Sequence, residues 1–186
     1  MKVIAINGSP RAGGNTGLAL RAMTDELERQ GIETETIQIG KESIHGCIAC
    51  DKCAENKDRR CVVKNDSANE CLEKMLGADG IILGSPVYFQ GVTPEMKALI
   101  DRVGYVARNN GRILKKKAGA SVVAVRRSGG VHTLDSMDHF FLAMQIVIVG
   151  RVLGIGRDKG DVERDAEGMA LASSLGRRMT WALGKL

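Results

Sequence analysis

The sequence predicts one α/β domain spanning residues 1–186, with a doubly wound five-stranded parallel sheet in the order 2-1-3-4-5 and helices on both faces. Strand-like and helix-like segments alternate along the whole chain, which is the pattern of a parallel sheet covered by helices. No repeat, low-complexity tract or linker divides the chain. With 44% hydrophobic and 26% charged residues, its 186 residues are enough for one buried core.

The first third of the chain is expected to give two strands, one helix and an insertion. The apolar run at 3–7 reads as the first, buried strand. A helix at 15–30 follows, because apolar residues recur at helical spacing and Gly31 can end it. The second strand is expected at 34–39. A Cys-rich insertion after this strand, residues 43–63, has no periodicity of either kind.

The middle of the chain is expected to give two helices and two strands. A helix at 67–76 leads into a short buried strand at 80–83. After a loop, Pro94 suits the first turn of a helix that runs to about residue 106. The next strand is expected at 120–125, where small and β-branched residues predominate.

The last third is expected to give a helix at 133–144, the fifth strand at 146–149 and a closing helix at 162–183. The lysine run at 115–117, which precedes the fourth strand, is expected to be a solvated turn.

Composition excludes several classes of protein. Aromatic residues make up only 3% of the chain and the net charge is a modest +5, so we expect no nucleic-acid partner. No apolar run is long enough to cross a bilayer, and the start of the chain lacks the features of a signal peptide. We therefore expect no membrane association and a cytoplasmic location. Five cysteines in such a chain favour metal or redox chemistry over disulfides.

Three loops that follow predicted strands have the composition of ligand-binding loops. The first, GSPRAGGNT at 8–16, combines glycines with Ser9, Arg11, Asn15 and Thr16 just before a helix. Backbone N–H groups at such a position cradle a phosphate. The loop lacks the Gly-Lys-Ser/Thr of a P-loop and does not match the GxGxxG dinucleotide pattern.

The second and third loops are suited to a flat ring. The loop at 84–91 places Tyr88 and Phe89 outside the predicted core, where they can cover an apolar ring system. The loop RRSGG at 126–130 offers backbone N–H groups to the other side of such a ring. Because the carboxyl ends of parallel strands meet at one edge of the sheet, we expect the three loops to form one site.

Together the motifs GSPRAGGNT, ADGIILGSPVYFQGVTPEMKALIDR and RRSGG resemble the NADPH-dependent FMN reductase group of flavodoxin-like proteins. The resemblance covers essentially the whole chain and implies a flavodoxin-like fold with bound FMN. It implies a cofactor site made of the phosphate ligands Ser9, Arg11, Asn15 and Thr16, the ring contacts Pro86, Val87, Tyr88 and Phe89, and the third-loop residues Arg127, Ser128, Gly129 and Gly130. Asp101 and Arg102 resemble an Asp-Arg pair of that group, for which we expect a structural role.

The cysteine spacing is the most specific local pattern. Cys47, Cys50 and Cys53 follow one another at two-residue intervals, and Cys61 comes seven residues later. Two-residue spacings let three thiolates converge on one centre, and a more distant fourth can complete a cubane. The pattern resembles the iron–sulfur flavoprotein family, in which four cysteines after the second strand hold a [4Fe–4S] cluster beside FMN. The longer spacing before Cys61 makes this ligand the least constrained of the four.

Other interpretations of the cysteines stay open. A structural zinc site usually draws two separated pairs of ligands rather than three evenly spaced cysteines. A thiol–disulfide switch, or a protein that holds no cluster when isolated, is also compatible with the spacing. Cys71 shares a helical face with Leu72 and Met75, so we expect it in the core rather than among the ligands.

These observations predict an electron-transfer flavoprotein without a catalytic nucleophile or general acid. The basic residues around the cysteines, namely Lys52, Lys57, Arg59 and Arg60, suit an acidic ferredoxin or another redox protein as partner. The alternatives are an NAD(P)H-dependent FMN or quinone reductase without a cluster, with NAD(P)H as substrate, and a redox-sensing FMN-binding protein. We expect a homodimer or homotetramer, because one domain leaves a flavin face and the cysteine segment exposed.

Overall fold

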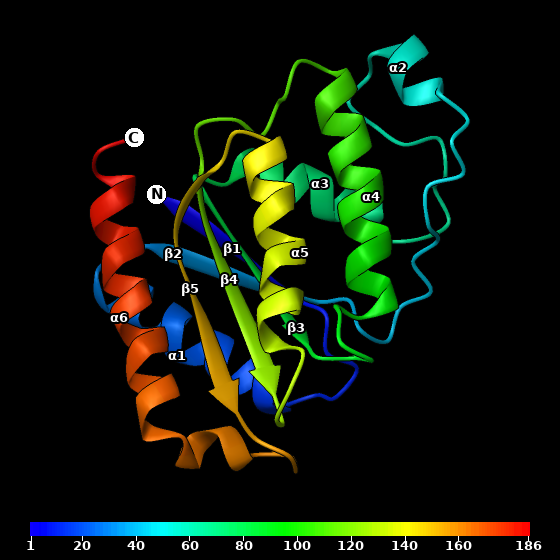
Figure 1. The fold of residues 1–186 in the computed structure, drawn as a ribbon. Coiled ribbons are helices and arrows are strands. Elements are labelled where there is room, and N and C mark those ends of the chain that lie inside the picture. Colours follow the sequence, from blue (N-terminus) through cyan, green and yellow to red (C-terminus); the bar gives the residue numbers. More distant parts are fainter.

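The computed structural model describes all residues 1–186 and contains a five-stranded, all-parallel sheet in the order β2-β1-β3-β4-β5 (Figure 1). The strands are β1 Lys2–Asn7, β2 Glu33–Gln38, β3 Gly80–Pro86, β4 Ala118–Val125 and β5 Val147–Ile155. The order reverses at β1, which pairs with β2 on one side and β3 on the other. The predicted sheet and strand order are confirmed.

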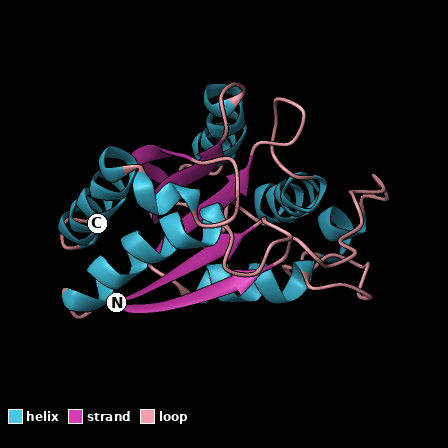
Figure 2. Ribbon diagram, turned by 90° about the horizontal axis from the view of Figure 1, so that it is seen from below, coloured by secondary structure: helices cyan, strands magenta, loops and turns pink.

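Helices cover both faces of the sheet (Figure 2). They are α1 Asn15–Arg29, α2 Lys52–Asn56, α3 Ala68–Gly77, α4 Pro94–Asn109, α5 Gly130–Ala143 and α6 Ala166–Leu183, with a 3-10 turn, η1, at Asp161–Arg164. α1 and α6 pack on one face, and α3, α4 and α5 on the other. None of these helices has both the length and the apolar character needed to traverse a bilayer.

Two hydrophobic clusters, one on each face, hold the layers together. Ile4 and Ile6 of β1 pack against α3 and α4, whereas Val3 and Ala5, with the opposite pleat, pack against α1 and α6. Strands buried on both faces are apolar without interruption, which explains why β1 can be recognised in the sequence as a continuous run.

The fifth strand is longer than predicted. We expected residues 146–149, but β5 continues to Ile155. Gly150 and Arg151 look like a break in the sequence, yet the strand accommodates the arginine at the edge of the sheet. There, the Arg151 guanidinium donates hydrogen bonds to Asp135 at 2.8 Å and Asp138 at 3.2 Å. A charged residue satisfied by neighbouring carboxylates does not end an edge strand.

Two further predictions needed correction near chain reversals. The closing helix is not continuous from residue 162, because Asp165 separates η1 from α6 and its side chain accepts a hydrogen bond from Gly168 N–H at 3.0 Å. The lysine run is only partly solvated. Lys117 is half-buried and donates hydrogen bonds to the carbonyls of Leu76 and Ala78 at the end of α3, and burial lowers its pKa.

Candidate functional site

The loops that follow β1 and β3 are tied together at the carboxyl edge of the sheet. Gly8 N–H donates to the Gly84 carbonyl at 2.7 Å. The Thr93 hydroxyl donates to the Gly8 carbonyl at 3.0 Å, and Thr93 N–H donates to the Ser85 hydroxyl at 3.1 Å. Thr93 and Ser85 are fully buried. The two loops are therefore held in a fixed relation before any ligand binds.

The loop at 8–16 leaves the Thr16 hydroxyl and the first N–H groups of α1 without side-chain partners. The turn closes by a hydrogen bond from Gly14 N–H to the Arg11 carbonyl at 3.0 Å, and α1 begins directly after it. Gly14, the N-cap of α1, provides no side-chain cap, so the first N–H groups of the helix lack side-chain partners. The Thr16 hydroxyl is buried without any hydrogen-bond partner. An orphaned hydroxyl at an uncapped helix N-terminus fits an anionic acceptor such as a phosphate.

A cleft of about 190 Å³ opens at this position and connects the ends of four strands, β1, β3, β4 and β5. Its lining comprises Ser9, Arg11, Asn15, Thr16, Pro86, Val87, Tyr88, Ala124, Arg126, Gly156 and Arg157. All four predicted phosphate ligands and three of the predicted ring contacts thus line one cavity. Phe89, Arg127, Ser128, Gly129 and Gly130 lie outside its lining.

Asn15 has a different role in the structure from that of a free phosphate donor. Its amide nitrogen donates to the Asp158 carbonyl at 2.9 Å, and its amide oxygen accepts from Gly160 N–H at 2.9 Å and Val162 N–H at 3.4 Å. The side chain therefore ties the loop after β5 to the start of α1. Through this loop it fixes the wall of the cleft that carries Arg157.

The predicted ring loop ends in a tight turn. Tyr88 and Gly91 exchange backbone hydrogen bonds, and the two residues between them have positive φ, 43° for Phe89 and 71° for Gln90. The Phe89 side chain is fully exposed. The third loop packs against this turn: Gln90 donates to the Ser128 hydroxyl at 3.3 Å. The two loops thus form one continuous rim beside the cleft.

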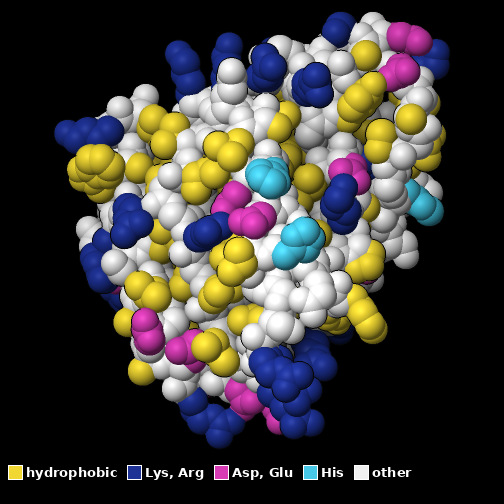
Figure 3. All heavy atoms as spheres, viewed as in Figure 1, with side chains coloured by type: hydrophobic (Ala, Val, Ile, Leu, Met, Phe, Trp, Pro, Cys, Tyr) yellow, Lys and Arg dark blue, Asp and Glu magenta, His cyan; other side chains and the backbone are white.

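The cleft carries more positive charge than its predicted residues supply. Arg11, Arg126 and Arg157 all line it, and none of the three forms an ion pair. Figure 3 shows Lys and Arg side chains gathered at the end of the molecule toward which β4 and β5 point. Gly156 and Arg157 were not predicted, because the fifth strand was expected to end six residues before its actual end at Ile155. A strand read through to Ile155 would have placed them at the ligand-binding edge.

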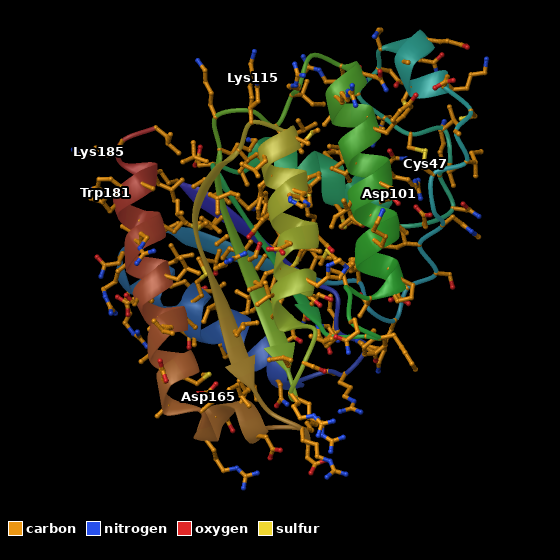
Figure 4. The ribbon with its side chains drawn as sticks, in the orientation of Figure 1. Cys47, Asp101, Lys115, Asp165, Trp181 and Lys185 are labelled. Atoms are coloured by element: carbon orange, nitrogen blue, oxygen red, sulfur yellow. The ribbon has the colours of Figure 1, made fainter.

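The cysteine segment, residues 43–63, forms a second candidate site beside α4 (Figure 4). Cys47, Cys50, Cys53 and Cys61 line one small pocket of about 20 Å³, with α4 forming part of its wall. Cys47 and Cys50 are exposed, whereas Cys53 is buried. The segment contains a one-turn helix, α2, that the sequence analysis did not predict.

Side chains from α3 and α4 hold this segment in place. The Asn69 amide oxygen accepts from Cys61 N–H at 2.8 Å, and its nitrogen donates to the carbonyls of Cys61 at 2.9 Å and Val63 at 3.1 Å. The Tyr105 hydroxyl donates to the Asp51 carboxylate at 2.5 Å. Asn110, just after α4, donates to the Cys53 carbonyl at 3.2 Å. The segment is therefore held by α3, which follows it closely in the chain, and by the more distant α4 and Asn110.

Arg102 of α4 is the charged group behind the cysteine pocket. Its guanidinium is buried, forms an ion pair with Asp66, and donates to the Val63 carbonyl at 2.8 Å. Burial lowers the pKa of Arg102, but the Asp66 carboxylate and the nearby Cys61 side chain outweigh this effect, so its pKa lies above the usual value. The structural role expected for Arg102 is consistent with these contacts, whereas its neighbour Asp101 is exposed and pairs with Lys97.

The donor set of the pocket suits a thiophilic metal or cluster. Burial raises the pKa of the Cys53 thiol, and electrostatic interaction with the nearby Cys61, Cys47 and Cys50 side chains raises it further. A metal centre that neutralises converging thiolates removes this penalty. In the structure as described, no three His, Cys, Asp or Glu side chains are arranged closely enough to hold a metal ion. The four cysteines share a pocket, and closer approach of their sulfur atoms would be needed for ligation.

Comparison with known proteins gives consistent results. The profile of the NADPH-dependent FMN reductase family matches residues 1–160. An iron–sulfur flavoprotein of Methanocaldococcus jannaschii is 38% identical over 96% of this chain and 95% of its own length. An iron–sulfur flavoprotein of Methanosarcina thermophila is 34% identical over 96% of this chain and 93% of its own length. Among solved structures, a flavodoxin from the domain Archaea superposes with a TM-score of 0.63 at 16% identity, covering 99% of both chains.

Proposed function

Because the chain belongs to the NADPH-dependent FMN reductase family, with iron–sulfur flavoproteins as relatives, it is an FMN-binding, flavin-dependent oxidoreductase, and we propose that it works in electron transfer. In this proposal, Cys47, Cys50, Cys53 and Cys61 hold a [4Fe–4S] cluster, and a ferredoxin-like protein is the redox partner. The observation that carries the proposal is the convergence of these four cysteines on one pocket beside α4.

The cleft at the carboxyl edge of the sheet fits the phosphate end of FMN. The orphaned Thr16 hydroxyl, the uncapped start of α1 and the unpaired guanidiniums would together satisfy a dianionic phosphate. Pro86, Val87 and Tyr88 would lie against the ring, and the loop at 126–130 would flank it. FMN supplies the exchange of one or two electrons when bound. The protein's residues supply binding, orientation and exclusion of water.

The cysteine segment would supply one-electron chemistry when a cluster is bound. Three features of this chain support that assignment: the two-residue spacings, the shared pocket, and the buried arginine behind it. Ile48, Val62 and Tyr105 add apolar cover around the cysteines. Such cover limits solvent access, one of the means by which a protein sets a cluster's potential.

The surface around the cysteines favours an acidic partner. Fewer of its basic side chains are free of ion pairs than the sequence suggests. Lys52 pairs with Glu55 at 2.7 Å, and Arg60 pairs with Glu73 at 3.0 Å. Lys57 donates to the carbonyl of Asn109 at 2.6 Å but keeps its charge, and it forms no ion pair. We propose that Lys57 and Arg59, rather than all four basic residues, supply the long-range attraction.

The deciding experiment is spectroscopic and analytical. Protein purified without oxygen should contain about one FMN, about four irons and about four sulfides per chain. Its spectrum should show broad absorption at about 400 nm in addition to the flavin bands. Reduced ferredoxin should then bleach both chromophores rapidly, whereas NADPH alone should act slowly. Protein that carries zinc, or neither metal nor sulfide, contradicts the cluster assignment.

A second candidate function is supported by the unpaired arginines. Arg126 and Arg157 exceed what one phosphate needs, and they fit the additional phosphates of NAD(P)H. This alternative is an NAD(P)H-dependent FMN or quinone reductase. Rapid bleaching of the bound flavin by NADPH, lost on Arg157→Ala and retained on Arg164→Ala, would support it over electron exchange with ferredoxin. Arg164 is a suitable control because it is exposed and pairs only with Asp161.

The surface also suits assembly of several copies. Phe89 is fully exposed and Trp181 is 67% exposed. Large apolar side chains in such positions commonly lie at subunit interfaces. We propose a homodimer or homotetramer, which sedimentation analysis of the FMN-loaded protein would detect; a stable monomer at micromolar concentration would contradict this.

A further inference from the structure

The most buried charged side chain of the protein lies at the cysteine pocket. The side chain of Arg102 is only 1% exposed, and that of its partner Asp66 is 2% exposed. A pair this far from solvent is costly to assemble unless its remaining hydrogen-bonding groups are satisfied. Packing alone therefore does not explain why a charged pair is buried at this position.

The hydrogen-bond partners of the guanidinium account for all but one of its nitrogen atoms. Nη1 donates to the Asp66 carboxylate and, at 3.4 Å, to the carbonyl of His45. Nη2 donates to the Val63 carbonyl at 2.8 Å. Nε is buried and has no hydrogen-bond partner. Since buried N–H groups are rarely left unpaired, this donor indicates an acceptor that comes within reach when the neighbouring pocket holds its ligand.

The cysteine pocket is where that acceptor would lie. Arg102 lines the same pocket as Cys47, Cys50, Cys53 and Cys61. Its other contacts, to the carbonyls of His45 and Val63 and to Asp66, bracket the cysteine segment at both ends. The guanidinium therefore ties the two ends of the segment together, and its Nε–H stays without a partner beside the pocket between them.

We propose that Arg102 is a positioning residue of the iron–sulfur site: it fixes the segment that carries the cysteines and presents its free Nε–H to a ligand sulfur, which raises the reduction potential of the bound cluster. This inference rests on the proposed function. One-electron reduction adds one negative charge to a cluster without forming or breaking a bond. A hydrogen bond to a ligand sulfur stabilises that charge, so it favours the reduced form.

The test uses three single substitutions in the full chain, loaded with both cofactors. Arg102→Lys keeps the charge but removes Nε–H and the planar fork. Asp66→Asn removes the negative charge that partly cancels the guanidinium. Asp101→Asn is the matched control, because it makes the same chemical change one residue away from Arg102 at an exposed position (Figure 4).

The readout is the reduction potential of the cluster, followed by electron paramagnetic resonance during titration with dithionite and mediators. The bound FMN in each sample serves as an internal reference. Arg102→Lys should lower the equilibrium constant for one-electron reduction about tenfold, equivalent to about 59 mV. Asp66→Asn should raise it, because a negative charge near the cluster is lost. Asp101→Asn should leave it unchanged.

A structural role alone would give a different pattern. If Arg102→Lys keeps iron, sulfide and FMN but does not change the potential, the tuning role is wrong. The tuning role is also wrong if Arg102→Lys and Asp66→Asn shift the reduction potential in the same direction. It is equally wrong if both variants lose iron and keep FMN, because Arg102 would then only stabilise the cysteine segment. Wild-type protein without iron would overturn the proposed function and this inference with it.

Discussion

The two candidate binding regions are held in place in different ways. The cleft that we propose for FMN is built on the carboxyl ends of buried strands, and backbone hydrogen bonds such as Gly8 N–H to the Gly84 carbonyl fix its loops. The cysteine segment is polar and largely exposed, and side chains such as Asn69 and Arg102 hold it from outside. The first region is therefore a property of the fold, and the second depends on a few individual contacts.

This difference has a consequence for cofactor loading. A cleft fixed by the sheet is preorganised, so little ordering is required when FMN binds. A segment with few apolar contacts is less ordered without its ligand than with it, so ligand binding contributes to its stability. We expect FMN binding to be insensitive to the state of the cysteines, and cluster retention to be sensitive to the contacts that hold the segment.

The largest expected effect separates the two regions completely. Cys50→Ser should abolish iron and sulfide binding, because a serine hydroxyl is a poor replacement for a thiolate ligand. FMN should remain at about one per chain, and the stability of the cluster-free protein should change by less than about 0.5 kcal/mol, since Cys50 is exposed. Metal analysis and flavin absorption check this. Loss of FMN together with iron would show that the regions are coupled.

The second prediction concerns the contacts that hold the cysteine segment. Asn69→Ala removes three hydrogen bonds to the backbone of Cys61 and Val63 and should destabilise the protein by about 2–4 kcal/mol. Iron should be lost faster on exposure to a chelator, while the affinity for FMN stays the same. Asn56→Ala, at an exposed residue in the same segment, is the control and should behave as wild type. Equal chelator sensitivity in both variants would contradict the proposed dependence.

The features that could be predicted from the sequence are those that depend on residues close together in the chain. The sheet order, the strand β1 and the glycine-rich loop at 8–16 follow from apolar runs and from glycines before a helix, which are local patterns. The predicted phosphate ligands do line one cleft. The cysteine spacing likewise identified residues that share a pocket. In each case, neighbours in the sequence carry the information.

What the sequence did not reveal depends on distant partners. The side chain of Asn15 was expected at the phosphate, but in the structure it binds the loop at 158–162, more than a hundred residues away. The fifth strand was predicted to end before Gly150, because the carboxylates that form hydrogen bonds with Arg151 lie on another element. The Asp66 partner of Arg102 also lies far from it in the chain. Such pairings follow from tertiary structure and leave no local pattern.

The third prediction examines the preorganised cleft. Thr16→Val replaces a buried hydroxyl that has no partner with a methyl group of similar shape. The FMN-free protein should therefore be as stable as wild type or slightly more stable, because an unsatisfied polar group is removed. The affinity for FMN should fall by about 1.5–3 kcal/mol, the usual contribution of a hydrogen bond to a charged group.

Calorimetric titration of FMN and thermal unfolding of the FMN-free protein measure the two quantities. Thr180→Val is the matched control, since that hydroxyl donates to the Gly176 carbonyl at 3.1 Å within α6 and lies outside the cleft lining. It should leave the affinity for FMN unchanged. If Thr16→Val destabilises the FMN-free protein and leaves the affinity for FMN intact, the hydroxyl is structural and the phosphate assignment at this residue is wrong.

The smallest expected effect comes from the fifth cysteine, which marks where the cysteine site ends. Cys71 is a fully buried residue of α3, and burial raises the pKa of its thiol to about 12. At neutral pH it is therefore a protonated, inert thiol, whereas the exposed Cys47 and Cys50 are open to reagents. In the folded, cluster-free protein, an alkylating reagent should modify Cys47 and Cys50 and leave Cys71 untouched until the protein unfolds.

Cys71→Ser should cost about 1 kcal/mol of stability and leave iron and FMN contents unchanged. If iron is lost from Cys71→Ser and retained in Cys61→Ser, then Cys71 is the fourth ligand in place of Cys61, and the cysteine site extends into the core.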